Sequence, residues 1–463
     1  MLSHLPPPNS PQFTMETLIN LIERPIVWLS QRLSSRDVLP DKAVHDGCLG
    51  TEIETGERFG LGASDFTRHA YILGSTGCGK TTLIMRLIDK DISNEHSFVV
   101  VDLRGDLVAG VLGLCANRDI DPARVTLLDL REKGPTFGFN ALAGAGEPYI
   151  RALHVLDVLA SESPSWGVQL EETLRSALLL LSNTASPITK LGQVFFDPAF
   201  RDRCLQQITD EDLIGFWARF NGFSKEKQQS WSLPVLNKVT SIMAVPNLRR
   251  ILGECDPIDL GELLGKPGQI LLVSLAVDEL QRSGRMFGSL VVSAIAREML
   301  ARVDVPEKDR NPVRLYVDEF ENMASESFEG LIAEGRRFKL SLVLSHQTLA
   351  QLPTRLRSVI RNNVGLQILF QVGFEDAQIV ARELGEETAL EDVRQLGVGE
   401  AFVQTRDGEA VLIQFDAPLK RPSERAVKRM RAAVLSRCKT LAKAAARNQP
   451  NPASPDIDLE EWL

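Results

Sequence analysis

Short, almost unbroken apolar runs recur along the chain from residue 69 to residue 404. Strands buried on both faces have this pattern, because helices cover both sides of a parallel sheet. Stretches of helical periodicity separate the runs, so the pattern predicts an α/β fold with a mostly parallel sheet. The predicted strands span residues 69–73, 97–102, 124–128, 269–274, 313–318, 340–345, 366–372 and 401–404.

A long segment without strand signals interrupts this alternation. Residues 149–253 carry repeated helical periodicity and predict an all-α insertion domain. Its polar middle, residues 222–231, is interpreted as a loop that exposes Lys225 and Lys227. The predicted parts of the chain are an N-terminal extension with short helices (1–46), a core in two pieces (47–148 and 254–418), the insertion (149–253) and a C-terminal tail (419–463).

The C-terminal tail has an uneven distribution of charge. Between residues 420 and 447 the acid Glu424 stands among Lys and Arg residues in an Ala-rich helical pattern, and an acidic tip with Trp462 follows. One interpretation is a solvated helix with a frayed end. The other is a nucleic-acid contact followed by a tip that binds a protein partner or competes with nucleic acid.

Composition limits the classes of protein that fit. The 463 residues are 44% hydrophobic and 24% charged, which is typical of folded proteins and excludes wholesale disorder. The formal net charge of −9 argues against a surface that coats nucleic acid everywhere, although a local basic groove fits. The 6 cysteines lie far apart, so neither a zinc site nor a disulfide framework is predicted. No apolar run suits a membrane span or signal peptide, and we expect a cytoplasmic protein.

A phosphate-binding loop is the clearest chemical motif. The segment from Gly74 to Thr81 reads G-x-x-x-x-G-K-T and lies between a predicted strand and a predicted helix, as the motif requires. The glycines let backbone N–H groups point at phosphate, and Lys80 would bridge the β- and γ-phosphates. We expect ATP here, with Thr81 binding Mg²⁺. The predicted nucleotide-binding residues are Gly74, Ser75, Thr76, Gly77, Cys78, Gly79, Lys80, Thr81 and Thr82.

Hydrolysis needs further polar groups on neighbouring strands. Asp318 ends a predicted strand and is the second magnesium candidate, while Glu319 is the candidate general base for water. Gln347 follows another strand and could contact the γ-phosphate or orient water. Arg336 and Arg337 precede that strand and are candidates for an arginine that acts in a neighbouring subunit, with Arg361 as a further candidate and surface ion pairing as the alternative for all three.

The phosphate-binding loop, the helical insertion and the later strands with polar ends occur in an order that resembles the HerA/FtsK superfamily of ring-forming motor ATPases. Within that superfamily the chain is most similar to the TraG/TraD-like coupling proteins of conjugation and type IV secretion. The resemblance covers residues 47–415. The segments that carry it are HAYILGSTGCGKTT, VVVDLRGDL, TFGFNAL, PVLNKVTSIMAVPNLRRILG, YVDEFENM, GRRFKLSLVLSHQTLAQL and the block around GEAFVQT.

The resemblance implies a RecA-like P-loop NTPase core that assembles as a hexamer, binds ATP between subunits and pulls DNA through a central channel. By position it assigns phosphate and magnesium to Lys80 and Thr81, magnesium to Asp318, water to Glu319 and the γ-phosphate to Gln347. Membrane coupling proteins usually begin with transmembrane helices, and we expect a relative that lacks them.

Three functions remain open from the sequence. The first is an ATP-driven DNA translocase. The second is an ATPase that recruits or moves protein cargo, with the insertion or the acidic tip as the docking surface. The third is a nucleotide-gated scaffold with little turnover, and the presence of Lys80, Asp318 and Glu319 argues against it.

Overall fold

A sheet of 11 strands organises the part of the chain that the structure describes. The computed structural model describes residues 48–161, 166–253, 256–323, 326–384, 390–406 and 408–448, so the predicted N-terminal extension and acidic tip lie outside it. The strand order is β2-β1-β11-β10-β9-β3-β8-β7-β4-β6-β5. From β9 to β5 the strands are parallel, and β10, β11 and β1 continue the sheet in antiparallel pairs.

The central strands contain almost exclusively buried residues, which explains why they read as apolar runs. All eight predicted strands are present, with boundaries that differ by at most two residues. The strand bounds are β1 Cys48–Glu52, β2 Arg58–Gly60, β3 Ala70–Leu73, β4 Ser97–Asp102, β5 Val125–Asp129, β6 Ile270–Ser274, β7 Val313–Val317, β8 Leu340–His346, β9 Leu366–Phe370, β10 Glu400–Thr405 and β11 Val411–Phe415.

The sequence prediction missed β1, β2 and β11. Each of these strands contains half-buried or exposed residues, as in β11 where only Ile413 and Phe415 are buried. Such strands lack the continuous apolar run on which the prediction relied.

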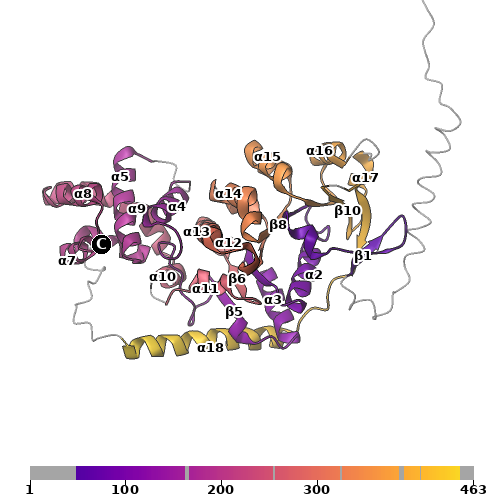
Figure 1. Ribbon diagram of the computed structural model, residues 1–463, viewed down its shortest axis with the longest axis horizontal. Helices are drawn as coiled ribbons and strands as arrows, with labels where there is room; N and C mark the ends of the chain where they lie inside the picture. Colours follow the sequence, from indigo (N-terminus) through magenta and orange to yellow (C-terminus); the bar gives the residue numbers. More distant parts are fainter. Residues whose placement is uncertain are drawn as a thin grey trace, which may run out of the picture. The chain divides into compact units, whose positions relative to one another are not determined.

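The order of the parallel strands decides which helices cover which face. The crossovers β3–β4 and β4–β5 run in one direction along the sheet, whereas β6–β7 and β7–β8 run in the other. Because such crossovers are right-handed, their helices lie on opposite faces. One face carries α2 (Lys80–Ser93) and α3 (Asp106–Asn117), and the other carries α13 (Arg282–Leu300) and α14 (Glu326–Glu334) (Figure 1).

Between β5 and β6 every described element is helical. The bounds are α4 Pro148–Ser161, α5 Val168–Asn183, α6 Leu191–Phe196, α7 Pro198–Leu205, α8 Glu211–Asn221, α9 Lys225–Met243, α10 Pro246–Gly253 and α11 Leu260–Gly265. The predicted loop at residues 222–231 is wrong in part, because α9 begins at Lys225, although Lys225 and Lys227 are exposed as expected. An aromatic cluster around Trp217 fills the interior of these helices.

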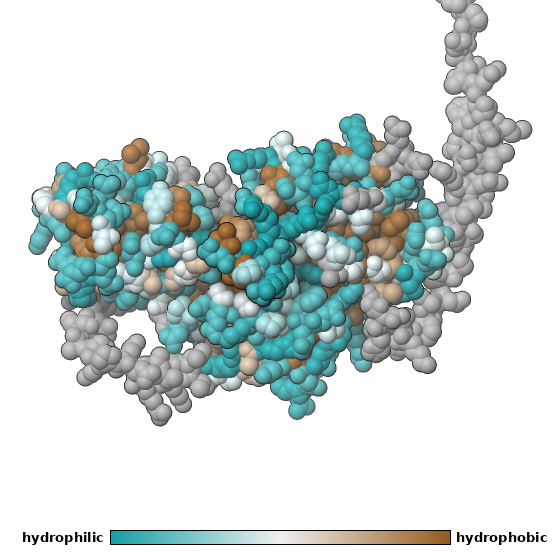
Figure 2. All heavy atoms as spheres, viewed as in Figure 1, coloured by the Kyte–Doolittle hydropathy of each residue, from teal (hydrophilic) through white to brown (hydrophobic). Residues whose placement is uncertain are grey.

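Hydrophobic patches interrupt the mostly hydrophilic surface of the insertion in Figure 2. The exposed large hydrophobic residues of its helices include Val168, Phe196, Ile214 and Leu233. In the described part of the chain, no helix has both the length and the apolar character needed to cross a membrane.

The remaining helices follow the strands of the second half of the chain. Their bounds are α12 Val277–Leu280, α15 Thr354–Asn363, α16 Phe374–Leu384, α17 Leu390–Arg394 and α18 Glu424–Asn448. The long basic helix α18 lies along α3 and beside β5 (Figure 1). Its inner side buries Met430, Val434 and Cys438, so α18 is a packed element of the fold rather than a wholly solvated helix.

Candidate nucleotide site

The phosphate-binding loop joins β3 to α2 in a conformation that requires its glycines. Gly77 and Gly79 have φ angles of +83° and +121°, a region that residues with a Cβ rarely adopt. A Cβ on Gly74 would lie 2.6 Å from the Cβ of Phe370. The backbone N–H of Ser75 donates to the carbonyl of Gln371 at 2.8 Å, which fixes the start of the loop.

Lys80 occupies the first position of α2, with Thr81 and Thr82 after it in the first turn. Lys80 is 8% exposed, and its Nζ donates to the carbonyls of Gly74 at 2.5 Å and Ser75 at 2.9 Å. Among the described residues it has no ion-pair partner. An ammonium has three donors, so one donor of a largely buried cation is available to phosphate, which fits the expected nucleotide.

Three side chains over the loop form a chain of hydrogen bonds. Thr76 Oγ1 donates to Gln347 Oε1 at 3.2 Å, and Gln347 Nε2 donates to Glu319 Oε1 at 2.7 Å. The strands β3, β8 and β7 are neighbours in the sheet, and their carboxyl ends meet at one edge. The structure therefore brings together the phosphate-binding loop and the two residues that the sequence predicts to handle water and the γ-phosphate.

The acidic residues after β7 form a compact group. Glu319 has a φ of +50°, a conformation in which a residue with a Cβ is strained. Its backbone N–H lies 3.1 Å from Asp318 Oδ1. Burial, followed by the neighbouring carboxylates Glu319 and Asp318, raises the pKa of Glu321 to about 7. Glu321 is the one acid in this group to which the sequence analysis gives no role.

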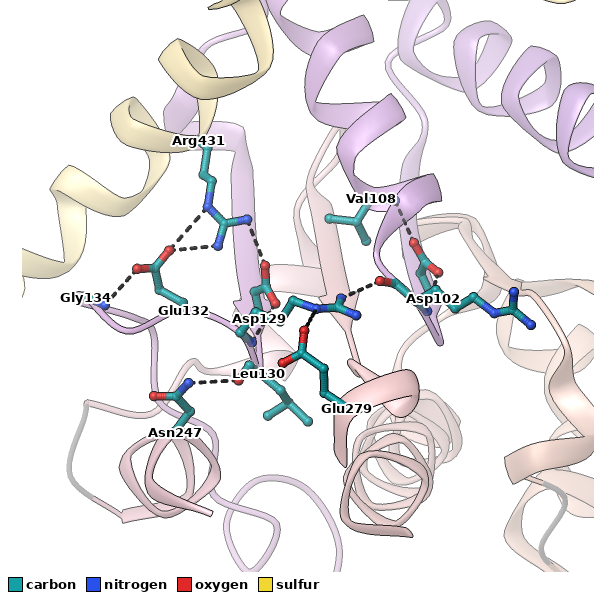
Figure 3. Close-up of polar contacts among 11 residues, drawn as sticks. Asp102, Val108, Asp129, Leu130, Glu132, Gly134, Asn247, Glu279 and Arg431 are labelled. Atoms are coloured by element: carbon teal, nitrogen blue, oxygen red, sulfur yellow. Dashed lines mark hydrogen bonds and ion pairs between the residues drawn. The ribbon is translucent and has the colours of Figure 1, made fainter. Parts of the chain in front are cut away.

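Asp102, whose function the sequence does not define, has a structural role. It is buried at the end of β4, and its carboxylate accepts from the backbone N–H groups of Arg104 at 3.0 Å and Val108 at 2.9 Å. Figure 3 shows the contact with Val108 at the start of α3. Asp102 thus shapes the loop that carries Arg104, a residue next to the site that the sequence analysis overlooks.

The candidate arginines lie away from the site of their own chain. Arg336 and Arg337 are exposed in a 3₁₀ turn just before the amino end of β8, while Gln347 follows its carboxyl end. A strand of this length separates them by about 20 Å. Arg361 lies on α15 and forms an ion pair with Glu383.

A second segment covers the phosphate-binding loop. The backbone N–H of Gly399 donates to the carbonyl of Cys78 at 2.9 Å, and Gly399 has a φ of +84°. Cys78 is 4% exposed, and burial raises the pKa of its thiol. The glycines on both sides of Val398 are the sequence signal that could have indicated this close approach.

Two segments of the chain match known protein families. Residues 48–131 match the family described as "Helicase HerA, central domain", and residues 312–412 match "TraM recognition site of TraD and TraG". The first segment contains the phosphate-binding loop, and the second runs from β7 through β10 to the start of β11. No curated protein sequence matches the chain.

Several solved structures of the conjugative coupling protein TrwB are similar to this chain. An unbound bacterial form aligns with a TM-score of 0.59 at 16% identity and covers 86% of this chain and 93% of that chain. The complex of plasmid TrwB with ADP and Mg²⁺ aligns with a TM-score of 0.59 at 17% identity, covering 86% and 94%. The complex with the ATP analogue ADPNP gives 0.57 at 17% identity, covering 86% and 93%.

The family matches confirm the resemblance to HerA/FtsK-type, coupling-protein-like ATPases that the sequence analysis names. The structural likeness confirms the α/β, RecA-like P-loop NTPase fold.

Proposed function

We propose that this chain is an ATP-hydrolysing motor that binds and translocates DNA as a ring of copies, with a hexamer expected. The observation that carries the proposal is the hydrogen-bond chain from Thr76 through Gln347 to Glu319 beside a buried Lys80. A site that merely binds nucleotide does not need a carboxylate and an amide aligned over its phosphate-binding loop. Structures of TrwB with ADP and Mg²⁺ support the choice of ligands.

Each residue has a defined task in this proposal. The loop N–H groups and Lys80 bind the phosphates, and the oxygens of Thr81 and Asp318 are ligands suited to Mg²⁺. Bound Mg²⁺ supplies neutralisation of phosphate charge. Glu319 accepts the proton of the attacking water, and Gln347 orients that water through its amide.

A ring is supported by the position of the candidate arginines. Arg336 and Arg337 are exposed at the sheet edge opposite their own phosphate-binding loop. They can therefore neutralise charge only at the site of a neighbouring copy. In a closed ring every copy would receive an arginine from its neighbour.

DNA binding is supported by the outer side of α18 and the segment before it. Five cations there are exposed, and their charges can neutralise phosphates. They are Lys420, Arg421, Arg425, Lys428 and Arg429.

The second candidate is an ATPase that recruits or moves protein cargo. Two observations favour it, namely the family description of residues 312–412 and the exposed hydrophobic residues of the insertion. In that case docking of a cargo protein onto the insertion or onto the acidic tip, rather than binding of DNA, would stimulate ATP turnover.

ATP turnover by the purified chain, with and without single- or double-stranded DNA, tests the proposal. Lys80→Ala is the negative control, because it removes the phosphate-binding ammonium. We expect Lys80-dependent turnover that DNA increases. ATP turnover that does not change when DNA is added would favour the cargo function. Absence of Lys80-dependent turnover would contradict an ATPase function altogether. Mass measurement in solution with an ATP analogue tests the ring.

A further inference from the structure

Arg104 lies beside the candidate general base, on the side away from the phosphate-binding loop. Its Nη2 atom is 3.5 Å from Glu319 Oε1, and its side chain is 65% exposed. The same Glu319 oxygen accepts the hydrogen bond from Gln347 Nε2. A cation and an amide donor therefore both lie at one oxygen of the Glu319 carboxylate, and together they limit how this carboxylate can turn toward water.

The strand order explains how residues far apart in sequence form this row. The strands β3, β8, β7 and β4 are consecutive neighbours. Thr76, Gln347, Glu319 and Arg104 follow the carboxyl ends of these strands in the same order. The row of polar contacts thus runs along the edge of the sheet, from the phosphate-binding loop to the loop after β4.

The backbone of Arg104 is fixed although its side chain is exposed. Its N–H donates to Asp102, and its carbonyl accepts from the guanidinium of Arg131. Arg131 also binds Glu279 at 2.8 Å and pairs with Asp278. Arg104 and Arg131 both line a pocket of about 350 Å³ at this edge of the sheet, so the Arg104 side chain has room to move away from Glu319.

Arg131 belongs to a loop after β5 that other parts of the chain contact. Asp129 Oδ1 accepts from the backbone N–H of Arg131, and Asp129 Oδ2 binds Arg431 of α18 at 2.8 Å. Asn247 of α10 donates to the carbonyl of Leu130 at 3.0 Å. Figure 3 shows that α18, the insertion and the core meet at this loop. A partner that binds α18 or the insertion would therefore contact an element that touches the loop carrying Arg131.

We propose that Arg104 is a positioning residue that restrains Glu319 in the resting state, and that Arg131 maintains this restraint by fixing the Arg104 loop. The inference rests on the proposed ATPase function. In this role Arg104 acts through the carboxylate of Glu319. Its release removes the cation from beside the Glu319 carboxylate and lets that carboxylate turn toward water.

The test compares ATP turnover of the wild type, Arg104→Ala and Arg104→Lys without DNA. We expect Arg104→Ala to raise kcat about two- to fivefold at unchanged KM, the size of effect that an exposed ion pair exerts. Arg104→Lys keeps the charge and should stay near the wild type. Arg118→Ala removes another exposed ion-paired arginine, at the far end of α3, and should change nothing.

Damage to the fold would lower kcat, so a rise separates positioning from a purely structural role. A kcat at or below the wild type in Arg104→Ala, or an equal rise in Arg104→Lys, would overturn the inference. Absence of Lys80-dependent turnover in the wild type would instead contradict the proposed function itself.

A double-mutant cycle tests the part played by Arg131. Arg131→Ala should raise kcat in the same direction, and the double variant Arg104→Ala/Arg131→Ala should not exceed Arg104→Ala. Such non-additivity is expected if Arg131 acts through Arg104. An unchanged kcat in Arg131→Ala, or independent multiplication of the two effects, would remove Arg131 from the proposal.

Discussion

Gln347 and Glu319 lie 28 positions apart in the sequence and are joined by a hydrogen bond of 2.7 Å. The bond connects the ends of two neighbouring strands, β8 and β7, and orients the Glu319 carboxylate over the phosphate-binding loop. Glu319→Gln keeps the shape of this side chain but cannot accept a proton from water.

We therefore expect Glu319→Gln to lower kcat by about 10²- to 10⁴-fold while ATP affinity changes little. Steady-state hydrolysis and fluorescent nucleotide titration measure the two quantities. Glu334→Gln alters an exposed glutamate at the end of α14 and serves as the matched control. Turnover within tenfold of the wild type would exclude Glu319 as the base.

The exposed cations of α18 allow a test of DNA binding that leaves its packing intact. Lys428→Gln/Arg429→Gln removes two exposed charges. If both contact phosphates, the slope of log affinity against log salt should become less steep by about 2. Lys266→Gln/Lys308→Gln, two exposed lysines elsewhere, is the control of equal charge. Identical slopes in the two variants would mean that Lys428 and Arg429 do not contact DNA phosphates.

Glu321 should make stability depend on pH. Its pKa rises from 4.5 to about 7 in the folded chain, chiefly through burial. The folded state therefore binds this proton more tightly than the unfolded state, and the contribution to the free energy of unfolding is lost as pH rises through about 7. Glu321→Gln has no carboxyl group to lose a proton, so its free energy of unfolding does not fall in this way. The free energy of unfolding of Glu321→Gln minus that of the wild type should therefore increase between pH 5 and pH 8. Urea midpoints of both proteins measure the difference, and parallel curves would contradict the assignment.

A buried ion pair joins the sheet to α2, the helix whose first residue is Lys80 of the nucleotide site. Arg314 of β7 lies 2.5 Å from Asp91 of α2, and the hydroxyl of Tyr316 donates to the other Asp91 oxygen at 2.6 Å. Arg314→Met would leave a carboxylate that is 1% exposed without its cation, at a cost of about 3–5 kcal/mol.

Denaturant unfolding measures this loss. Arg175→Met breaks an exposed pair with Glu171 on α5 and should cost less than about 1 kcal/mol. Equal losses in the two variants would show that burial does not determine the strength of the Arg314 pair.

The parallel core was predictable because its strands are buried on both faces. β4 reads SFVVVD and all its residues are buried, so the sequence marks it without knowledge of its neighbours. The phosphate-binding loop was predictable for a different reason, since its glycines and Lys80 are consecutive. The antiparallel strand β11 escaped prediction because water reaches part of it.

The proximity of Arg104 to Glu319 could not be read from the sequence. It depends on β4 lying next to β7, and a strand order is decided by tertiary packing rather than by local pattern. The polar loop predicted at residues 222–231 failed for a related reason. Packing of Trp231 against Phe216 and Phe223 stabilises a helix whose own sequence is polar.

The position of α18 beside β5 has a further consequence for how the protein behaves when shortened. β5 is the last strand of the sheet, and Arg437 of α18 donates to the main-chain carbonyls of Val125 at 2.8 Å and Pro122 at 2.9 Å. An uncovered terminal strand is a template for pairing with other chains. Removal of α18 would uncover part of β5, whose five residues are all buried and include the apolar Val125, Leu127 and Leu128. Such a truncated protein should therefore aggregate before any effect on DNA could be seen.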